Sequence, residues 1–178
     1  MVGWLYIVET ILMNSSTDFD KLVESHSVEI FAYLWRLLRN TEDAEDCLQE
    51  TYIRAFRAFH RLWEGSNQRA WLYKIATNVA NTHLKRQQQI SARIIHLDPE
   101  MIPNGNVNQS DIERSNLLVS IQQAVETLPE KQRAALLLRK YQGLDYVEIG
   151  TALKCSPEAA RANVYQALKK LRSQFTEN

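Results

Sequence analysis

Apolar side chains recur every three or four residues along most of the first half of the chain, the spacing of amphipathic helices. We expect three helices, at about 18–39, 41–63 and 68–89, with a turn at residues 64–67. Thr41 is expected to cap the second helix. The apolar residues expected on the inner faces are Phe19, Leu22, Val23, Ile30, Phe31, Leu34, Leu37, Leu38, Leu48, Tyr52, Ala55, Phe56, Phe59, Leu62, Trp71, Leu72, Ile75, Ala76, Val79 and Leu84.

The N-terminal stretch MVGWLYIVETILM is apolar but does not resemble a membrane or targeting segment. It is too short to span a bilayer, has no basic region before it, and is interrupted by Glu9. A more ordinary start follows at Met13. We therefore expect residues 1–14 to be an N-terminal extension, either a mis-called start or loosely ordered, and we expect no membrane insertion.

The helical spacing stops between residues 91 and 110, where HLDPEMIPNGNVNQS brings together prolines, asparagines and a glycine. It resumes with a helix that carries Leu117, Leu118, Ile121, Val125 and Leu128, and with another that starts near Pro129 and stops at Gly143. The fold class predicted is all-α, with two small helical domains joined by a flexible linker. The boundaries predicted are 1–14 for the extension, 15–90 and 112–178 for the domains, and 91–111 for the linker.

The end of the chain has the order of a helix-turn-helix. Asp145 and Glu148 form a predicted capping box, Lys154 and Cys155 a short turn, and Ser156 the cap of the last helix. The second helix of such a pair enters the major groove, where Asn and Gln pair with adenine and Arg and Lys meet phosphates. On this pattern alone, a plain bundle helix remains an equal alternative. The candidate contacts are Ser156, Arg161, Ala162, Asn163, Tyr165, Gln166, Lys169, Lys170 and Arg172.

The net charge is zero, but the charges are grouped in blocks. Residues 1–50 carry three basic and ten acidic side chains, whereas residues 51–90 carry seven basic and one acidic. Residues 91–128 carry two basic and five acidic side chains, and residues 129–178 carry nine basic and five acidic. Two basic blocks favour two surfaces for a polyanion, although solvated helix faces would give the same pattern.

The third predicted helix places aromatic rings beside positive charge, the combination that binds single-stranded nucleic acid. Trp71 and Tyr73 could stack on bases, although Trp71 and Leu72 could equally be core residues. Neither cysteine, Cys47 nor Cys155, has the spacing of a metal site, and they are typical of reduced thiols in a cytosolic protein. The sequence contains no phosphate loop, nucleophile elbow or Glu-x-x-His, so we expect no catalytic residue, metal or cofactor and a protein that is not an enzyme.

Three segments together resemble the sigma-70 family of RNA polymerase sigma factors, specifically the extracytoplasmic-function (ECF) group. They are DAEDCLQETYIRAFRAF, RAWLYKIATNVANTHLKR and LPEKQRAALLLRKYQGLDYVEIGTAL. The resemblance covers about 18–90 and 112–175. It implies a cytoplasmic protein that binds core RNA polymerase and promoter DNA, and an anti-sigma factor that restrains it. The alternative is a helix-turn-helix regulator that acts without polymerase, which would leave residues 41–90 unexplained.

The resemblance also implies roles for individual residues. The helix that docks on core polymerase would present Asp46, Gln49, Glu50 and Arg54. The −35 element would be read as duplex by the last helix, with Arg161, Asn163 and Gln166 at the reading positions. The −10 element would be captured as single strand and melted, which involves flipping a base out of the stack. The residues matching that role are Trp63, Ser66, Asn67, Gln68, Trp71, Tyr73, Lys74, Asn78, Asn81, Lys85 and Arg86.

This chain departs from the family pattern at positions that bear on promoter choice. Asn81 stands where the family usually has Asp, and Gln68 where an aromatic residue is frequent. The last helix reads AARAN at 159–163 in place of Thr-Val-x-Ser-Arg, and Gln166 replaces a common Arg. The promoter preference therefore cannot be transferred from relatives.

Overall fold

The computed structural model describes residues 2–63, 65–93 and 119–176, and places side chains from residue 18 to 90, except 64, and from 119 to 175. These residues form helices and turns without a strand, in agreement with the predicted all-α class. The predicted linker lies almost wholly outside them, since only residues 91–93 are described, and these continue a helix. Among the described residues, no helix is long and apolar enough to cross a membrane.

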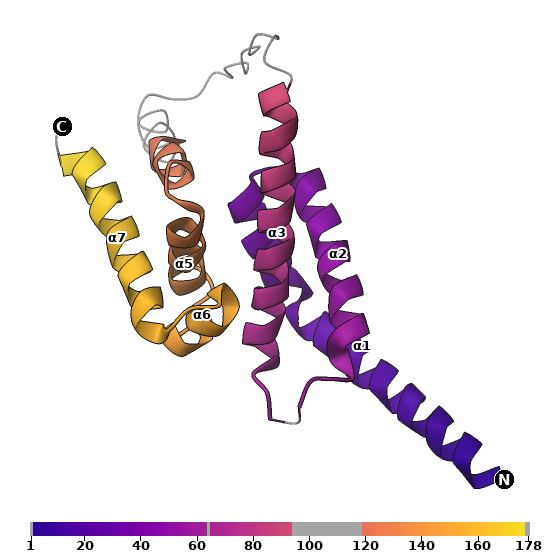
Figure 1. Cartoon of the computed structure of the whole chain (residues 1–178). Helices are drawn as coiled ribbons and strands as arrows, with labels where there is room; N and C mark the ends of the chain where they lie inside the picture. Colours follow the sequence, from indigo (N-terminus) through magenta and orange to yellow (C-terminus); the bar gives the residue numbers. More distant parts are fainter. Residues whose placement is uncertain (1, 64, 94–118, 177–178) are drawn as a thin grey trace, which may run out of the picture.

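The first unit consists of α1 (Val2–Leu38), α2 (Thr41–Phe59) and α3 (Gln68–Arg93), which pack side by side (Figure 1). Our predicted start for α1 was wrong, because the helix begins at Val2, and its first turns extend beyond the other helices (Figure 1). Our predicted cap for α2 was also wrong. The Asn40 side chain accepts a hydrogen bond from the Asp43 amide at 3.1 Å, so Asn40 caps this helix and Thr41 is its first residue.

Helix α2 packs through small side chains. Its buried residues are Ala44, Cys47, Thr51 and Ala55, spaced three or four positions apart. Phe56 lies one position beyond this stripe and is 58% exposed, so our prediction that it is buried was wrong. The small stripe allows close approach of the neighbouring helices and leaves larger side chains at the edges of α2.

The second unit contains a helical stretch at residues 119–126, then α5 (Glu130–Lys140), α6 (Tyr146–Leu153) and α7 (Pro157–Thr176). The predicted capping box of α6 is present: the Glu148 amide donates to Asp145, and the Asp145 amide donates to Glu148, both at 2.8 Å. Lys154 ends α6 in the left-handed conformation, with a φ of 52°. The helix-turn-helix is therefore formed by α6 and α7, as predicted.

The two units pack against each other. Helix α6 lies beside the first half of α3, and α5 lies beside α1 (Figure 1). Buried side chains from both units belong to one apolar cluster, which includes Leu34 and Leu72 from the first and Leu138 and Ile149 from the second. The two helical units of this structure thus share part of their core.

Candidate nucleic-acid interface

The turn between α6 and α7 is tight because Gly150 brings the two backbones together. The Cys155 amide donates to the Gly150 carbonyl at 2.9 Å, and a Cβ atom at position 150 would stand 2.7 Å from the Cys155 carbonyl oxygen. Ser156 then caps α7, since its hydroxyl accepts from the Ala159 amide at 3.2 Å. This turn fixes the direction in which α7 leaves α6.

Helix α7 buries one face and leaves the opposite face open. Ala160, Val164 and Ala167 are buried against the rest of the unit. The predicted −35 residues that the structure exposes are Ser156, Arg161, Ala162, Tyr165, Gln166, Lys169 and Lys170. Asn163 differs, because it is half-buried and its amide donates to the Ala159 carbonyl at 2.9 Å. The exposed residues other than the cap follow helical spacing, so they share one continuous surface.

The ring of Tyr146, at the start of α6, is approached by two guanidinium groups. The Arg139 group is 4.8 Å from the ring centre and the Arg161 group is 5.1 Å from it. Arg139 also donates to the Leu144 carbonyl at 2.8 Å. A cation over a tyrosine face is attracted by the ring, so this contact restrains Arg161 at the edge of the exposed α7 face. The sequence pattern gave no signal for this contact.

Helix α3 presents cations at its C-terminal end, where Lys85 and Arg86 are exposed. Four other predicted residues of this helix are half-buried: Trp71, Lys74, Asn78 and Asn81. Tyr73 is 0% exposed, and its ring and the buried Tyr33 ring form a T-shaped pair with a centroid distance of 5.4 Å. Burial raises the pKa of Tyr73 well above its usual value. Tyr73 is therefore a core residue in this structure and is not available to stack on a base.

The turn before α3 exposes an aromatic ring beside a polar cap. Trp63 is 81% exposed, Gln68 is exposed and Ser66 is half-buried. Asn67 caps α3 by accepting from the Ala70 amide at 2.8 Å, and its own amide nitrogen donates to Glu148 of α6 at 2.9 Å. The turn thus carries an exposed aromatic ring, that of Trp63, and a polar side chain, that of Asn67, which is already hydrogen-bonded to the second unit.

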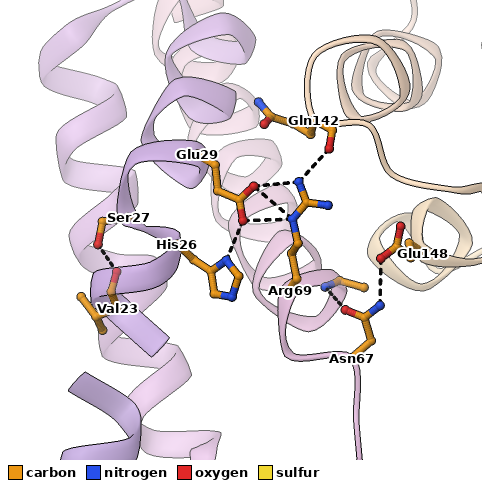
Figure 2. Close-up of polar contacts among 9 residues, drawn as sticks. Val23, His26, Ser27, Glu29, Asn67, Arg69, Gln142 and Glu148 are labelled. Atoms are coloured by element: carbon orange, nitrogen blue, oxygen red, sulfur yellow. Dashed lines mark hydrogen bonds and ion pairs between the residues drawn. The ribbon is translucent and has the colours of Figure 1, made fainter. Parts of the chain in front are cut away.

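Arg69 joins three segments of the chain, as Figure 2 shows. It donates to both carboxylate oxygens of Glu29 at 2.7–3.0 Å and to the carbonyl of Gln142 at 2.7 Å. His26 lies 2.6 Å from the same carboxylate. Burial alone would raise the pKa of Glu29, but the hydrogen bonds from Arg69 and His26 outweigh burial and hold that pKa below its usual value.

The outer face of α2 combines charged and apolar side chains. Asp46 and Gln49 are exposed, and Glu50 accepts a hydrogen bond from Arg54 at 2.6 Å. Ile53 and Phe56 are exposed along the same part of the helix. The sequence analysis missed this exposed apolar pair, because it assigned Phe56 to the core and did not single out Ile53. Exposed apolar groups beside charges are typical of a protein-binding surface.

Comparison with known protein families gives matches over both helical units. The family model for Sigma-70 region 2 matches residues 22–90, and the model for Sigma-70, region 4 matches residues 118–171. The chain is 32% identical to the RNA polymerase sigma factor CarQ of Myxococcus xanthus over 160 residues, which is 89% of this chain and 90% of CarQ. It is 31% identical to the ECF RNA polymerase sigma factor SigE of Mycolicibacterium smegmatis, but spans 63% of the length of that protein.

Two solved structures have a similar fold. The sigma factor RpoE of Bartonella quintana, in complex with the anti-sigma factor NepR, aligns with a TM-score of 0.67 at 22% identity, over 89% of this chain and 97% of RpoE. CnrH, in complex with the cytosolic domain of CnrY, aligns with a TM-score of 0.65 at 19% identity, over 92% and 90%. At these identities the likeness concerns the fold alone.

Proposed function

Because this chain belongs to the ECF group of the sigma-70 family, we propose that it binds core RNA polymerase and directs promoter-specific transcription initiation in the bacterial cytoplasm. The observation that carries this proposal is the pair of family matches, which fall on the two helical units in order. An operator-binding regulator would need α6 and α7 but would leave the first unit without a role. The regulator is therefore the weaker candidate.

We assign −35 reading to α7. Its exposed face carries an amide, a phenol ring and several cations on one surface, in Gln166, Tyr165, Arg161, Lys169 and Lys170. Gln pairs bidentately with adenine, whereas Arg and Lys neutralise phosphates and fix the register. Tyr146 acts as a positioning residue, since its ring restrains Arg161.

We assign −10 capture to the turn before α3, at residues 63 and 65–67, and to α3. Trp63 offers an exposed ring for an unstacked base, and stacking of one base on an aromatic side chain is worth about 1–3 kcal/mol. Lys85 and Arg86 then follow the DNA backbone. This assignment keeps the other predicted residues of α3 but omits Tyr73, which is buried.

We assign core polymerase docking to the outer face of α2, where Asp46 and Gln49 lie beside exposed Ile53 and Phe56. A clamp surface with basic and apolar groups would complement this face. The complex of RpoE with the anti-sigma factor NepR also supports an anti-sigma factor as a regulator of this chain.

The docking assignment is tested by measuring the affinity of the full chain for core polymerase with a fluorescent label. The Asp46→Lys variant should bind at least about tenfold more weakly, because like charges placed across an interface cost several kcal/mol. The matched control is Asp20→Lys, which reverses an exposed acid on α1 outside the proposed face. Equal affinity of Asp46→Lys and Asp20→Lys would refute the docking face, and failure of the unmodified chain to bind core polymerase would refute the function.

A further inference from the structure

We propose that Glu158 is a specificity-determining residue of the −35 surface, and that its carboxylate selects cytosine at one position of the element. This role rests on the proposed function, since it assigns a base to the face of α7 that would read the −35 element. Glu158 is absent from the candidate contacts that the sequence pattern indicated, although it stands between two of them, Ser156 and Arg161.

Glu158 extends the exposed face of α7 to the start of that helix. It lies in the first turn of α7 and is exposed. It stands three residues before Arg161 and eight residues before Gln166, so helical spacing places it on the same surface as these two side chains. In a helix-turn-helix, the N-terminal residues of the second helix are the ones that contact base edges. Glu158 therefore occupies a position from which a side chain reads a base.

The carboxyl group of Glu158 is held in its charged form and keeps acceptor capacity. Its own backbone amide lowers the pKa of Glu158 most, and the Ser156 hydroxyl and the Arg161 charge lower it further. The Arg161 guanidinium lies over the Tyr146 ring, and within the part of the chain that the structure describes the Glu158 carboxylate forms no ion pair. An ionised carboxylate has about four acceptor sites, so sites remain for a donor on DNA.

An acid on a surface that binds DNA must meet a base edge rather than the backbone. Phosphates are attracted by the cations of this face, Lys169 and Lys170, but repelled by the Glu158 carboxylate. The same carboxylate occupies the N-terminal end of α7, where a bare helix end would attract a phosphate. Glu158 therefore contributes to binding where it meets a hydrogen-bond donor, and the donors of the major groove lie on the bases.

The pattern of donors in the major groove selects one base for a carboxylate. Only cytosine, through N4, and adenine, through N6, present a donor there. Adenine sets its N7 acceptor beside the donor, and guanine and thymine present acceptor oxygens, so each of these bases brings a lone pair toward the carboxylate. Cytosine presents its N4 donor without such an acceptor. Glu158 should therefore read cytosine, whereas Gln166, which carries both a donor and an acceptor, suits adenine at another position.

The variant Glu158→Gln separates reading of a base from support of the helix end. It keeps the shape of the side chain, removes its charge and adds a donor, which is the combination that adenine requires. Core polymerase with the full-length chain transcribes a promoter library that is randomised at each −35 position. The parent chain should favour cytosine at one position by about fivefold or more, and Glu158→Gln should lose this preference and favour adenine there. The matched control is Glu130→Gln, which removes the first-turn acid of α5 and should leave the base preferences unchanged.

Each other outcome of the library experiment would overturn the role of Glu158. An unchanged preference in Glu158→Gln would show that the carboxylate reads no base. A uniform gain at every promoter would show that it faces a phosphate, because removal of a repulsive charge strengthens backbone binding whatever the sequence. An equal loss of preference in Glu130→Gln would show a general effect of helix stability. In these cases the parent chain still directs promoter-specific transcription, so the proposed function stands, whereas a parent chain without such transcripts would refute both.

Methylation of the cytosine amino group tests the contact itself. The preferred cytosine is replaced by N4-methylcytosine, in which the methyl group takes the place of the N4 hydrogen that base pairing does not use. Initiation by the parent chain should fall about fivefold or more, whereas Glu158→Gln, which no longer uses this donor, should be unaffected. Equal losses in the two chains would show that the methyl group is excluded by its size, and would overturn the hydrogen bond between Glu158 and cytosine.

Discussion

Replacing Gly150 by Ala should destabilise the helix-turn-helix, although Ala is the better helix former. In an unhindered helix the exchange would stabilise by roughly 1 kcal/mol. Here the added Cβ atom would stand 2.7 Å from the Cys155 carbonyl oxygen and 3.4 Å from the Pro157 nitrogen. These are backbone atoms of the turn, so the turn itself must move, and overpacking of this kind costs about 1–3 kcal/mol or more. Because the 2.7 Å contact is with a backbone atom, we place the cost at about 2–3 kcal/mol, which leaves a net loss of about 1–2 kcal/mol.

The assay is thermal unfolding of the full chain followed by circular dichroism, where this loss corresponds to a fall in Tm of about 2–8 °C. The matched control is Thr151→Ala, an exposed neighbour on α6 that gains helix propensity without a clash. Because the turn sets the direction of α7, −35 binding should weaken in Gly150→Ala and not in the control. A Gly150→Ala chain as stable as the parent, with unchanged DNA binding, would refute the argument from close approach.

Two further predictions concern single side chains. Glu29→Gln should destabilise the chain by about 1–3 kcal/mol at neutral pH, since hydrogen bonds to a charged acceptor are lost. The lowered pKa of Glu29 means that its contribution is present above the ordinary value of 4.5 and is lost as the pH falls through the lowered value. The gap between parent and variant, measured by urea unfolding from pH 7 to pH 3, should therefore narrow only in the acid range. Gln166→Ala should remove about 1–3 kcal/mol of base discrimination at one −35 position in a promoter library, whereas Gln174→Ala, further along α7, should leave the preference unchanged. Identical preferences in the two variants would remove Gln166 from the reading face.

The local structure could be predicted where short-range chemistry decides it. The Asp145 and Glu148 capping box and the Ser156 cap were predictable, because the side chain and the amide it binds lie three residues apart. The cap of α2 was misassigned because Asn40 and Thr41 are both suitable types in adjacent positions. The start of α1 was misplaced. The sequence analysis began the helix at residue 18, but in the structure the helix begins at Val2 and has no break at residue 18.

Burial was harder to predict where large and small apolar residues compete for one helix face. Phe56 looked like a core residue by size, but the stripe from Ala44 to Ala55 is buried instead, and Phe56 is left at the edge against Phe19. Tyr73 looked like a stacking residue because it stands among cations, but it lies in the core. Contacts between distant segments, such as Asn67 with Glu148, leave no trace in local spacing, so they could not be read from the sequence.

Reconstituted transcription across a promoter library, with start-site mapping, tests the central claim most directly. Core polymerase with the purified chain should start transcription at a defined subset of promoters that share −35 and −10 sequences, and core polymerase alone should not. Binding of the free chain to duplex DNA at nanomolar concentration, with no new transcripts when core polymerase is added, would contradict the claim and favour a regulator that acts without polymerase.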